Sequence, residues 1–272
     1  MEREYGGLIK ALIAKRLHKE KVSPMGPRGV LTTFKEGIGY LPRIAAERLG
    51  DGRCRRLRLN AKALAVRRAG NAYRIEVEGK PGVEAERVII AVPAHTAAAI
   101  TTELPGDPAK HLAAIPYADV AVVCTAYPRD HVAHDVNGFG FVVPRNQGKR
   151  VLGCLWTSAL FPGQAPAGHV LLRTMYGGYT DPDAVTLTDN GLLDLLKREV
   201  HPLLGIHHDP ELVRIYRHRP GIPQYLLGHA KRVAAIRTAQ DANPGLAFAG
   251  NAYRGVGLND CVLAAHRAVA TL

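Results

Sequence analysis

A glycine-punctuated turn near the end of the chain constrains the fold more than any other stretch. Residues 246–249 form a short apolar run, three glycines fall within residues 250–257, and the apolar residues 262–272 predict a helix. Glycine permits a sharp turn and a close approach of the backbone to a ligand, because it carries no Cβ. Asn259 or Asp260 can cap the helix through a side-chain oxygen. Free N–H groups and the positive end of the helix dipole would then face an electron-rich or anionic group.

A tight turn that uses glycine for steric reasons alone is the other interpretation of this stretch. Gly255 and Gly257 form a G-x-G pair without the third glycine of a dinucleotide-binding fingerprint. Spacing by itself therefore does not decide between the two interpretations.

Length and charge set broad limits on what the chain can be. It has 272 residues, 47% of them hydrophobic, which suffices for one large domain or two modest ones. Lys and Arg outnumber Asp and Glu by 36 to 24, a net charge of +12. That excess suits an acidic ligand or an anionic membrane surface, although a solvated basic surface explains it equally well. Four arginines within residues 53–58 have no interleaved aromatic residues for base stacking, so we expect no nucleic-acid partner.

The residue types that bind metals or anchor a chain show no recognisable pattern. Four widely spaced cysteines without a C-x-x-C pair disfavour a zinc site and indicate reduced thiols in a cytoplasmic protein. His207, His208 and Asp209 are adjacent, but adjacent side chains rarely converge on one ion, so we expect no metal. Residues 1–20 lack the apolar core of a signal peptide, and no run approaches membrane-spanning length. Any membrane contact would be peripheral, at the inner face of the cell membrane.

Hydrophobic periodicity predicts a mixed α/β (α+β) fold. The first part of the chain indicates part of a doubly wound layer. It contains a predicted helix over residues 1–24, paired strands over 57–66 and 73–77, and an apolar run at 88–92 of the type buried on both faces of a sheet. Four strand candidates without intervening helices then predict an antiparallel sheet, namely residues 120–127, 139–143, 151–156 and 170–175. Helices starting near Asp189 and over 225–240 follow, and the terminal strand, turn and helix return to the first layer.

Dispersed motifs resemble one family of flavoenzymes. Residues 250–261 resemble the G-x-S/A-Y/F-x-G-V-x-x-x-D-C-I motif of oxygen-dependent protoporphyrinogen oxidases, and residues 222–229 resemble the "PQY…GH" signature of the same family. Three more stretches match in the family's order: residues 4–11 (E-x-G-S-L-I-x-A), 34–42 (F-x-G-G-L-x-x-L-P, with Glu36 replacing a glycine) and 158–166 (S-x-x-F-P-x-R-A-P). Several ordered matches are far more specific than one glycine turn.

This resemblance implies FAD as the cofactor and a porphyrinogen as the substrate, with O2 as the electron acceptor. The flavin carries such chemistry, so no catalytic nucleophile is expected from the protein. The terminal helix would stabilise negative charge on the flavin through its dipole and the N–H groups of Val256, Gly257 and Leu258. Ala63 matches the position at which the family contacts the adenine through its backbone.

The family's substrate pocket lies over the antiparallel sheet. Four positions of this chain match it, Gly140, Val142, Leu155 and Met175, and they would pack against a flat apolar macrocycle. Core packing is the alternative for the last three, because one face of a strand is buried in any case.

The chain departs from the family pattern because it lacks the strand–G-x-G-x-x-G–helix unit that holds the FAD pyrophosphate, and so resembles only the C-terminal part. We therefore expect a helical segment at 1–25, an incomplete FAD-binding part at 26–100, an antiparallel substrate-binding sheet at 101–220 and a return to the FAD-binding part at 221–272. An N-terminal half, supplied by another chain or lost from the gene model, would complete the enzyme. The alternatives are a remnant that binds porphyrin or a partner without redox activity, and a related flavin amine oxidase or desaturase.

Overall fold

The computed structural model describes residues 31–50 and 57–272. Contacts divide the chain into two units, Met1–Leu41 and Pro42–Leu272. In the described part of the first unit, the rings of Phe34 and Tyr40 lie 5.3 Å apart between centroids. Helix α3 spans Tyr40–Gly50. The helix predicted over residues 1–24 lies outside the described residues.

The second unit begins with a three-stranded antiparallel meander and a two-stranded parallel sheet. The meander consists of β1 (Ala63–Ala69), β2 (Ala72–Val77) and β3 (Lys80–Ala85), and the parallel pair joins β4 (Val88–Ile90) to β10 (Leu246–Phe248). Four helices accompany them: α4 (Ala94–Ile100), α5 (Pro108–Ala113), α9 (His229–Asp241) and α10 (Leu258–Ala270). Strands far apart in the sequence thus share one layer, as the predicted return of the chain requires.

The expectation that residues 88–92 are buried on both faces is wrong in part. Only Val88–Ile90 form strand β4, and the side chains of Ile89 and Val92 are each 38% exposed. Among the described residues, β4 has β10 as its single strand partner. Parallel sheets are normally wider than two strands and covered on both faces. The described two-stranded sheet is too narrow to bury every residue of the apolar run 88–92.

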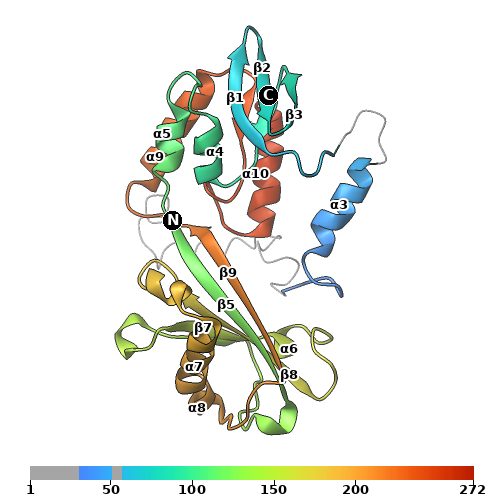
Figure 1. Ribbon diagram of the computed structural model, residues 1–272, viewed down its shortest axis with the longest axis vertical. Coiled ribbons are helices and arrows are strands. Elements are labelled where there is room, and N and C mark those ends of the chain that lie inside the picture. The colour runs from blue at the N-terminus through green and yellow to red at the C-terminus, as the bar shows by residue number, and fades with distance from the viewer. Residues whose placement is uncertain (1–30, 51–56) are drawn as a thin grey trace, which may run out of the picture. The chain divides into compact units, whose positions relative to one another are not determined.

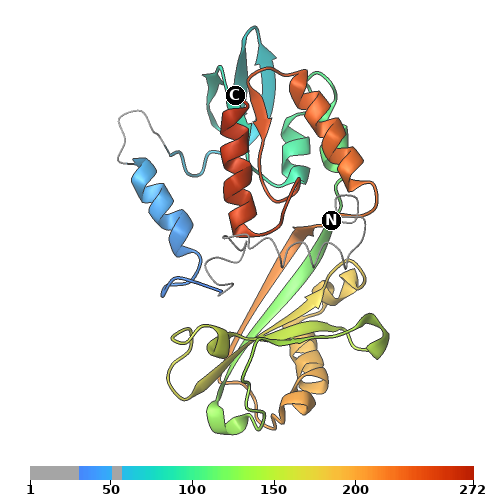
Figure 2. The same cartoon turned by 180° about the vertical axis from the view of Figure 1, so that it is seen from behind.

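A five-stranded antiparallel sheet follows, in the order β6-β7-β8-β5-β9. Figures 1 and 2 show β5 and β9 running side by side as its longest members. The predicted strands are confirmed as β5 (Tyr117–Pro128), β6 (Gly140–Val142), β7 (Val151–Trp156) and β8 (His169–Gly177), and β9 is Leu212–Pro223. Short helices fill the connections: η2 (Arg129–His131), η3 (Arg145–Gln147), α6 (Thr157–Leu160), η4 (Pro182–Thr186) and α8 (His201–Leu204).

Strand β9 is absent from the sequence predictions. It forms an edge of the sheet, its sequence includes Arg214, Arg217 and Arg219, and most of its side chains are exposed. Charged residues and proline are typical of edge strands, where they discourage pairing with other chains. The same features hide the apolar alternation that would reveal a strand.

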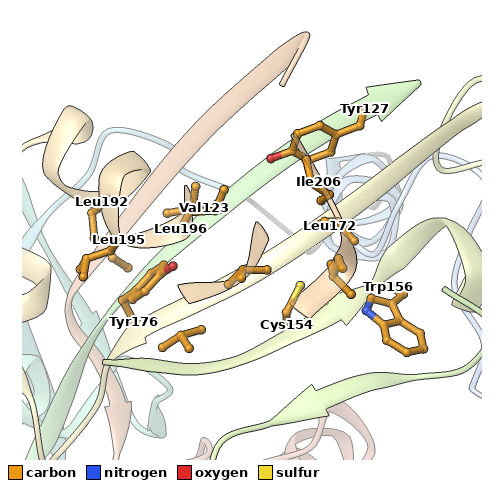
Figure 3. Close-up of a cluster of buried hydrophobic side chains, with 14 of the residues drawn as sticks. Val123, Tyr127, Cys154, Trp156, Leu172, Tyr176, Leu192, Leu195, Leu196 and Ile206 are labelled. Carbon is orange, nitrogen blue, oxygen red and sulfur yellow. The ribbon is translucent and has the colours of Figure 1, made fainter. Parts of the chain in front are cut away.

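Helix α7 (Asp189–Glu199) covers one face of this sheet. Thr188 caps it by accepting a hydrogen bond from the Gly191 backbone N–H at 3.1 Å. Leu192, Leu195 and Leu196 recur at helical spacing and are buried, and Figure 3 shows them beside Tyr176 of β8. The cluster continues along the sheet through Val123, Tyr127, Cys154, Leu172 and Ile206. One face of the sheet is therefore committed to the core.

Glu199 fixes the end of α7 to the start of β7. Its buried carboxylate accepts hydrogen bonds from the backbone N–H groups of Arg150 at 3.0 Å and Val151 at 2.9 Å. Charge-assisted bonds of this kind orient the helix on the sheet.

Replacing Leu196, which is fully buried, should create a cavity between α7 and the sheet. We expect Leu196→Ala to lower the free energy of unfolding by about 2–5 kcal/mol, measured by urea denaturation. Leu203→Ala is the matched control, because Leu203 is 54% exposed, and it should change stability by less than about 0.5 kcal/mol. Equal effects of the two substitutions would show that α7 does not cover the core.

Candidate functional site

The turn between β10 and α10 is built by two glycines and one carboxylate. Gly250 and Gly255 have φ values of 131° and 71°, which disfavour residues with a Cβ. A Cβ on Gly255 would lie 2.4 Å from Asp260 Cγ. The Asp260 carboxylate accepts a hydrogen bond from the Gly257 N–H at 3.1 Å, so it caps the helix, one of the two predicted caps. Helix α10 begins at Leu258, earlier than the predicted residue 262, because this cap lies before the apolar stretch.

The backbone of the turn still offers unused donors. Among the residues that the structure describes, the N–H groups of Val256 and Leu258 have no hydrogen-bond partner. The side chains of Val256 and Leu258 are 60% and 47% exposed, so the turn is open rather than covered. The N–H of Gly257, by contrast, is occupied by Asp260. Two of the three N–H groups expected to face a flavin are therefore free to do so.

The "PQY…GH" stretch holds this turn in place. The Tyr225 hydroxyl donates to the carbonyl of Asn251 and lies 3.4 Å from that of Gly255. His229 Nε2 lies 3.1 Å from the carbonyl oxygen of Tyr253, which can only accept, so Nε2 carries the proton. The rings of Tyr225 and His229 stack with centroids 4.0 Å apart. Burial raises the pKa of Tyr225, which keeps its hydroxyl protonated as a donor.

We call these contacts of Tyr225 and His229 with the turn the clamp. The clamp joins two motifs that are far apart in the sequence, since Tyr225 and Asn251 are 26 residues apart. The sequence indicates both motifs, but no pattern in it reveals that the second positions the first.

Ala63 lies at the start of β1, paired with Val77, and is half-buried. Its meander shares a hydrophobic cluster with the turn, because Val66 and Tyr73 belong to the same buried group as Ala252 and Tyr253. The layer that carries Ala63 and the glycine turn thus belong to one packed structure. Its expected contact with an adenine stays a prediction.

The residues present fit one end of a bound FAD. Exposed N–H donors at the first turn of a helix suit the electron-rich edge of a flavin ring. The described residues contain no strand–G-x-G-x-x-G–helix unit for the pyrophosphate.

The second part of the site is the face of the five-stranded sheet opposite α7. Cross-strand pairing places Val142, Gly153, Met175, Val122 and Tyr216 in one row across all five strands. Val142 is 80% exposed and Tyr216 is 53% exposed, and none of the five belongs to the buried cluster under α7. The row forms an apolar strip on the open face.

A neighbouring row carries charge. Gly140, Leu155, Arg173, Cys124 and Arg214 are paired across the same five strands, two residues along from the apolar row. Gly140 must lack a side chain, since a Cβ would lie 2.1 Å from the carbonyl oxygen of Cys154. Burial raises the pKa of Cys124, with the charge of Arg173 acting in the opposite direction.

The structure therefore places Gly140, Val142, Leu155 and Met175 on one open face, outside the core under α7. Their predicted contact with substrate is not tested by this placement. Arg173 and Arg214 are the residues that the sequence did not single out. The signal that could have found Arg173 is the alternation along β8. Leu171, Arg173 and Met175 lie on one face, and the residues between them are buried.

The histidine-rich stretch shows no metal geometry. Across the described part of the chain, no group of three or more His, Cys, Asp or Glu side chains could hold an ion. His208 instead stacks on His131, with ring centroids 3.9 Å apart. No helix within the described ranges is both long enough and apolar enough to cross a bilayer.

Comparison with known proteins identifies the family of this fold and site. Residues 3–272 match the model of the family "Flavin containing amine oxidoreductase". The chain is 29% identical over 252 residues to coproporphyrinogen III oxidase of Bacillus subtilis, covering 90% of this chain and 53% of that protein. It is 30% identical over 287 residues to the chloroplastic protoporphyrinogen oxidase of Oryza sativa, covering 98% and 52%. The chain thus spans about half the length of the curated relatives it matches.

Solved structures agree with this assignment. A crystal structure of a protein from Exiguobacterium sp. 255-15, described as "putative protoporphyrinogen oxidase", superposes with a TM-score of 0.77 at 26% identity. The match covers 98% of this chain and 55% of that one. Putrescine oxidase, at 19% identity and a TM-score of 0.60, shares the fold. The expected mixed α/β fold with an antiparallel sheet is confirmed by these similarities.

The cap of α10 can be tested by adding a methyl group at Gly255. In Gly255→Ala the new Cβ would displace the Asp260 carboxylate, so we expect a loss of about 1 kcal/mol for the cap in addition to backbone strain. Amide hydrogen exchange in residues 257–261 should accelerate several-fold, as measured by mass spectrometry.

Gly79→Ala is the matched control for this substitution. Its φ is 61° and nothing lies within 4 Å of the added Cβ, so it carries the strain without the collision. Faster exchange in α10 of the control, or none in Gly255→Ala, would contradict the role given to Asp260.

Proposed function

This chain belongs to the flavin containing amine oxidoreductase family, and we propose that it serves the FAD-dependent oxidation of a porphyrinogen to a porphyrin with O2 as the acceptor. Protoporphyrinogen IX and coproporphyrinogen III are the two candidate substrates. The observation that carries the proposal is the open strand–turn–helix, clamped by Tyr225 and His229, in the same chain as an open sheet face with an apolar row. The names of the relatives in two porphyrinogen oxidase groups support it.

The turn would hold the cofactor's ring and stabilise negative charge on it. When bound, FAD supplies the hydride-accepting chemistry that protein side chains lack. Val256 and Leu258 would donate their free N–H groups, and the dipole of α10 adds positive potential at the same place. The clamp fixes these donors before the reaction, so no reorganisation is needed when charge develops. Ala63 would contact the adenine through its backbone.

The open sheet face would hold the substrate. Val142, Leu155 and Met175 would pack against a flat macrocycle, and Gly140 and Gly153 leave the surface free of side chains between them. Arg173 and Arg214 are exposed on the same face and would pair with the substrate's carboxylates. The protein's part is thus to orient the macrocycle.

The proposed function also requires a segment that binds the FAD pyrophosphate. We propose that an N-terminal half supplies the pyrophosphate-binding unit and pairs with the two-stranded β4–β10 sheet. The four-part division into segments 1–25, 26–100, 101–220 and 221–272 belongs to the same proposal. The net charge of +12 favours a peripheral contact with an anionic membrane surface.

A second candidate function is porphyrin binding without redox activity. The observation that favours it is the narrow parallel sheet: in the described residues two strands carry the layer that would have to hold the dinucleotide. This candidate retains the sheet face and dispenses with the flavin.

The visible spectrum and porphyrin fluorescence of the purified full-length chain separate the two candidates. We expect FAD to bind stoichiometrically and protoporphyrinogen IX or coproporphyrinogen III to be converted to fluorescent porphyrin faster than without protein. Porphyrin binding without flavin binding would favour the second candidate and overturn the first.

Leu258→Pro tests the backbone donor directly. Proline is favoured at the first helical position, and Gly257 has φ −76° and ψ 159°, which a residue before proline adopts readily. The substitution therefore removes one N–H without breaking α10. We expect the dissociation constant for FAD, measured by quenching of flavin fluorescence, to rise about tenfold relative to Leu258→Ala, which keeps the N–H. Equal affinities of the two variants would remove Leu258 N–H from the site.

Arg173→Gln/Arg214→Gln tests the sheet face. We expect the dissociation constant for coproporphyrin III, followed by its absorption shift, to rise about tenfold because two charged partners of its carboxylates are lost. Arg74→Gln in β2 is the matched control, since Arg74 is likewise exposed and takes part in no ion pair within the described residues. An unchanged affinity in the double variant would place the macrocycle elsewhere.

A further inference from the structure

A cavity of about 620 Å³ lies between α9 and α10. Phe248 of β10 and Tyr253 of the turn line it together with both helices. Figures 1 and 2 show α9 in orange and α10 in red as two separate helices. The cavity is distinct from the open sheet face, because none of the residues in the two rows described above lines it.

The walls of the cavity are apolar. Val233 and Ile236 contribute from α9, and Leu263 and Ala264 from α10. Leu263 is 48% exposed. Cavities of this size with apolar walls and a few polar groups are typical of small-molecule sites.

Three arginines also line the cavity: Arg237 on α9, Arg254 in the turn and Arg267 on α10. Each is exposed, and none of their guanidinium groups has a hydrogen bond or ion pair within the described part of the chain. Other arginines of the same unit are neutralised, for example Arg150 by Asp181 at 2.7 Å and Arg217 by Asp189 at 2.6 Å. The three cavity arginines therefore have unused charge.

One carboxylate lines the cavity, and it is already engaged. Asp260 accepts the Gly257 N–H at 3.1 Å and takes part in no ion pair within the described residues. The remaining charge of the lining is positive, so the cavity favours an anion.

The arginines are spread along the length of the cavity. Arg254 precedes α10, whereas Arg267 lies near its end, and Asp260 and Arg267 are separated by roughly 10 Å of helix at 1.5 Å per residue. Charges at both ends of an apolar floor suit an elongated molecule more than a compact ion such as phosphate.

A buried hydroxyl adds a second, independent observation. Tyr253 is nine-tenths buried, and its hydroxyl has no hydrogen-bond partner among the described residues. The same residue lines an adjoining cavity of about 360 Å³, where His229 Nδ1 is also buried without a partner. Unsatisfied buried polar atoms are costly, so a polar partner near these two residues would be stabilising.

We propose that the cavity between α9 and α10 binds an elongated organic anion with an apolar body, whose anionic group is held by Arg237 and Arg267. The apolar body lies on Phe248 and Leu263, and the anionic group accepts hydrogen bonds from these two guanidinium groups, whereas Arg254 lies in the turn. The cavity adjoins the turn proposed to hold the flavin, since Gly255 and Asp260 line it, but Arg237 and Arg267 are not among the flavin or porphyrinogen contacts proposed above.

Isothermal titration of the full chain with dodecanoate, below its micelle concentration, tests this proposal. We expect saturable binding to the unmodified protein at about one equivalent. Arg237→Gln/Arg267→Gln should raise the dissociation constant about tenfold or more, because two charge-assisted hydrogen bonds are lost. Absence of saturable binding, or an unchanged constant in the double variant, would overturn the proposal.

Two further variants locate the bound dodecanoate on the protein. Ala264→Trp fills the cavity from the α10 side and should abolish dodecanoate binding, with circular dichroism confirming that the chain is folded. If that variant fails to fold, the arginine double variant still decides the question. Arg173→Gln/Arg214→Gln, on the sheet face, should leave dodecanoate binding unchanged. A loss of binding in this last variant would assign the anion to the porphyrinogen face instead and would also overturn the proposal.

Discussion

The geometry of the candidate site depends on the clamp between Tyr225, His229 and the glycine turn. A turn with positive φ values at Gly250 and Gly255 has many accessible conformations and would lose much entropy on ordering. Hydrogen bonds from Tyr225 and His229 to the carbonyl groups of the turn restrict those conformations. Because these bonds use carbonyl groups, they leave backbone N–H groups free for a ligand. The Asp260 cap acts in the opposite sense, since it occupies the N–H of Gly257.

The five-stranded sheet buries one face in the core and leaves residues of the other face exposed. Alternation along β7 and β8 sends Cys154, Leu172 and Tyr176 into the core under α7. The residues between them, such as Leu155 and Met175, are then forced onto the other face. Within the described ranges α7 lies on one side, and on the other side Val142 and Tyr216 are 80% and 53% exposed. Helix α7, together with Val185 of η4 and Leu204 of α8, therefore buries one face of the sheet and not the face with the apolar row.

Sequence reasoning predicted the parts of this protein where one local pattern dominates. The strands β5 to β8 alternate clearly, and the turn before α10 has a distinctive glycine pattern. It failed for β9, whose Arg214 and Arg217 mask the alternation at a sheet edge, and for Ile89, which is 38% exposed in the described two-stranded sheet of β4 and β10. It also could not reveal the clamp on the turn or the register that aligns Arg173 with Arg214 through Cys124. These features arise from contacts between residues far apart in the sequence, which no local pattern encodes.

The structure divides the arginines behind the net positive charge into two groups, those that form ion pairs with acidic residues and those that do not. Arg67, Arg150 and Arg217 pair with acids, and they contribute to the fold rather than to recognition. Arg173, on the sheet face, and Arg237 and Arg267, beside the cavity, have no such partner in the described chain. An unpaired guanidinium beside an apolar surface attracts molecules that combine carboxylates with an apolar body. Two separate surfaces of this chain meet that description, and their distinct positions allow each to be altered without changing the other.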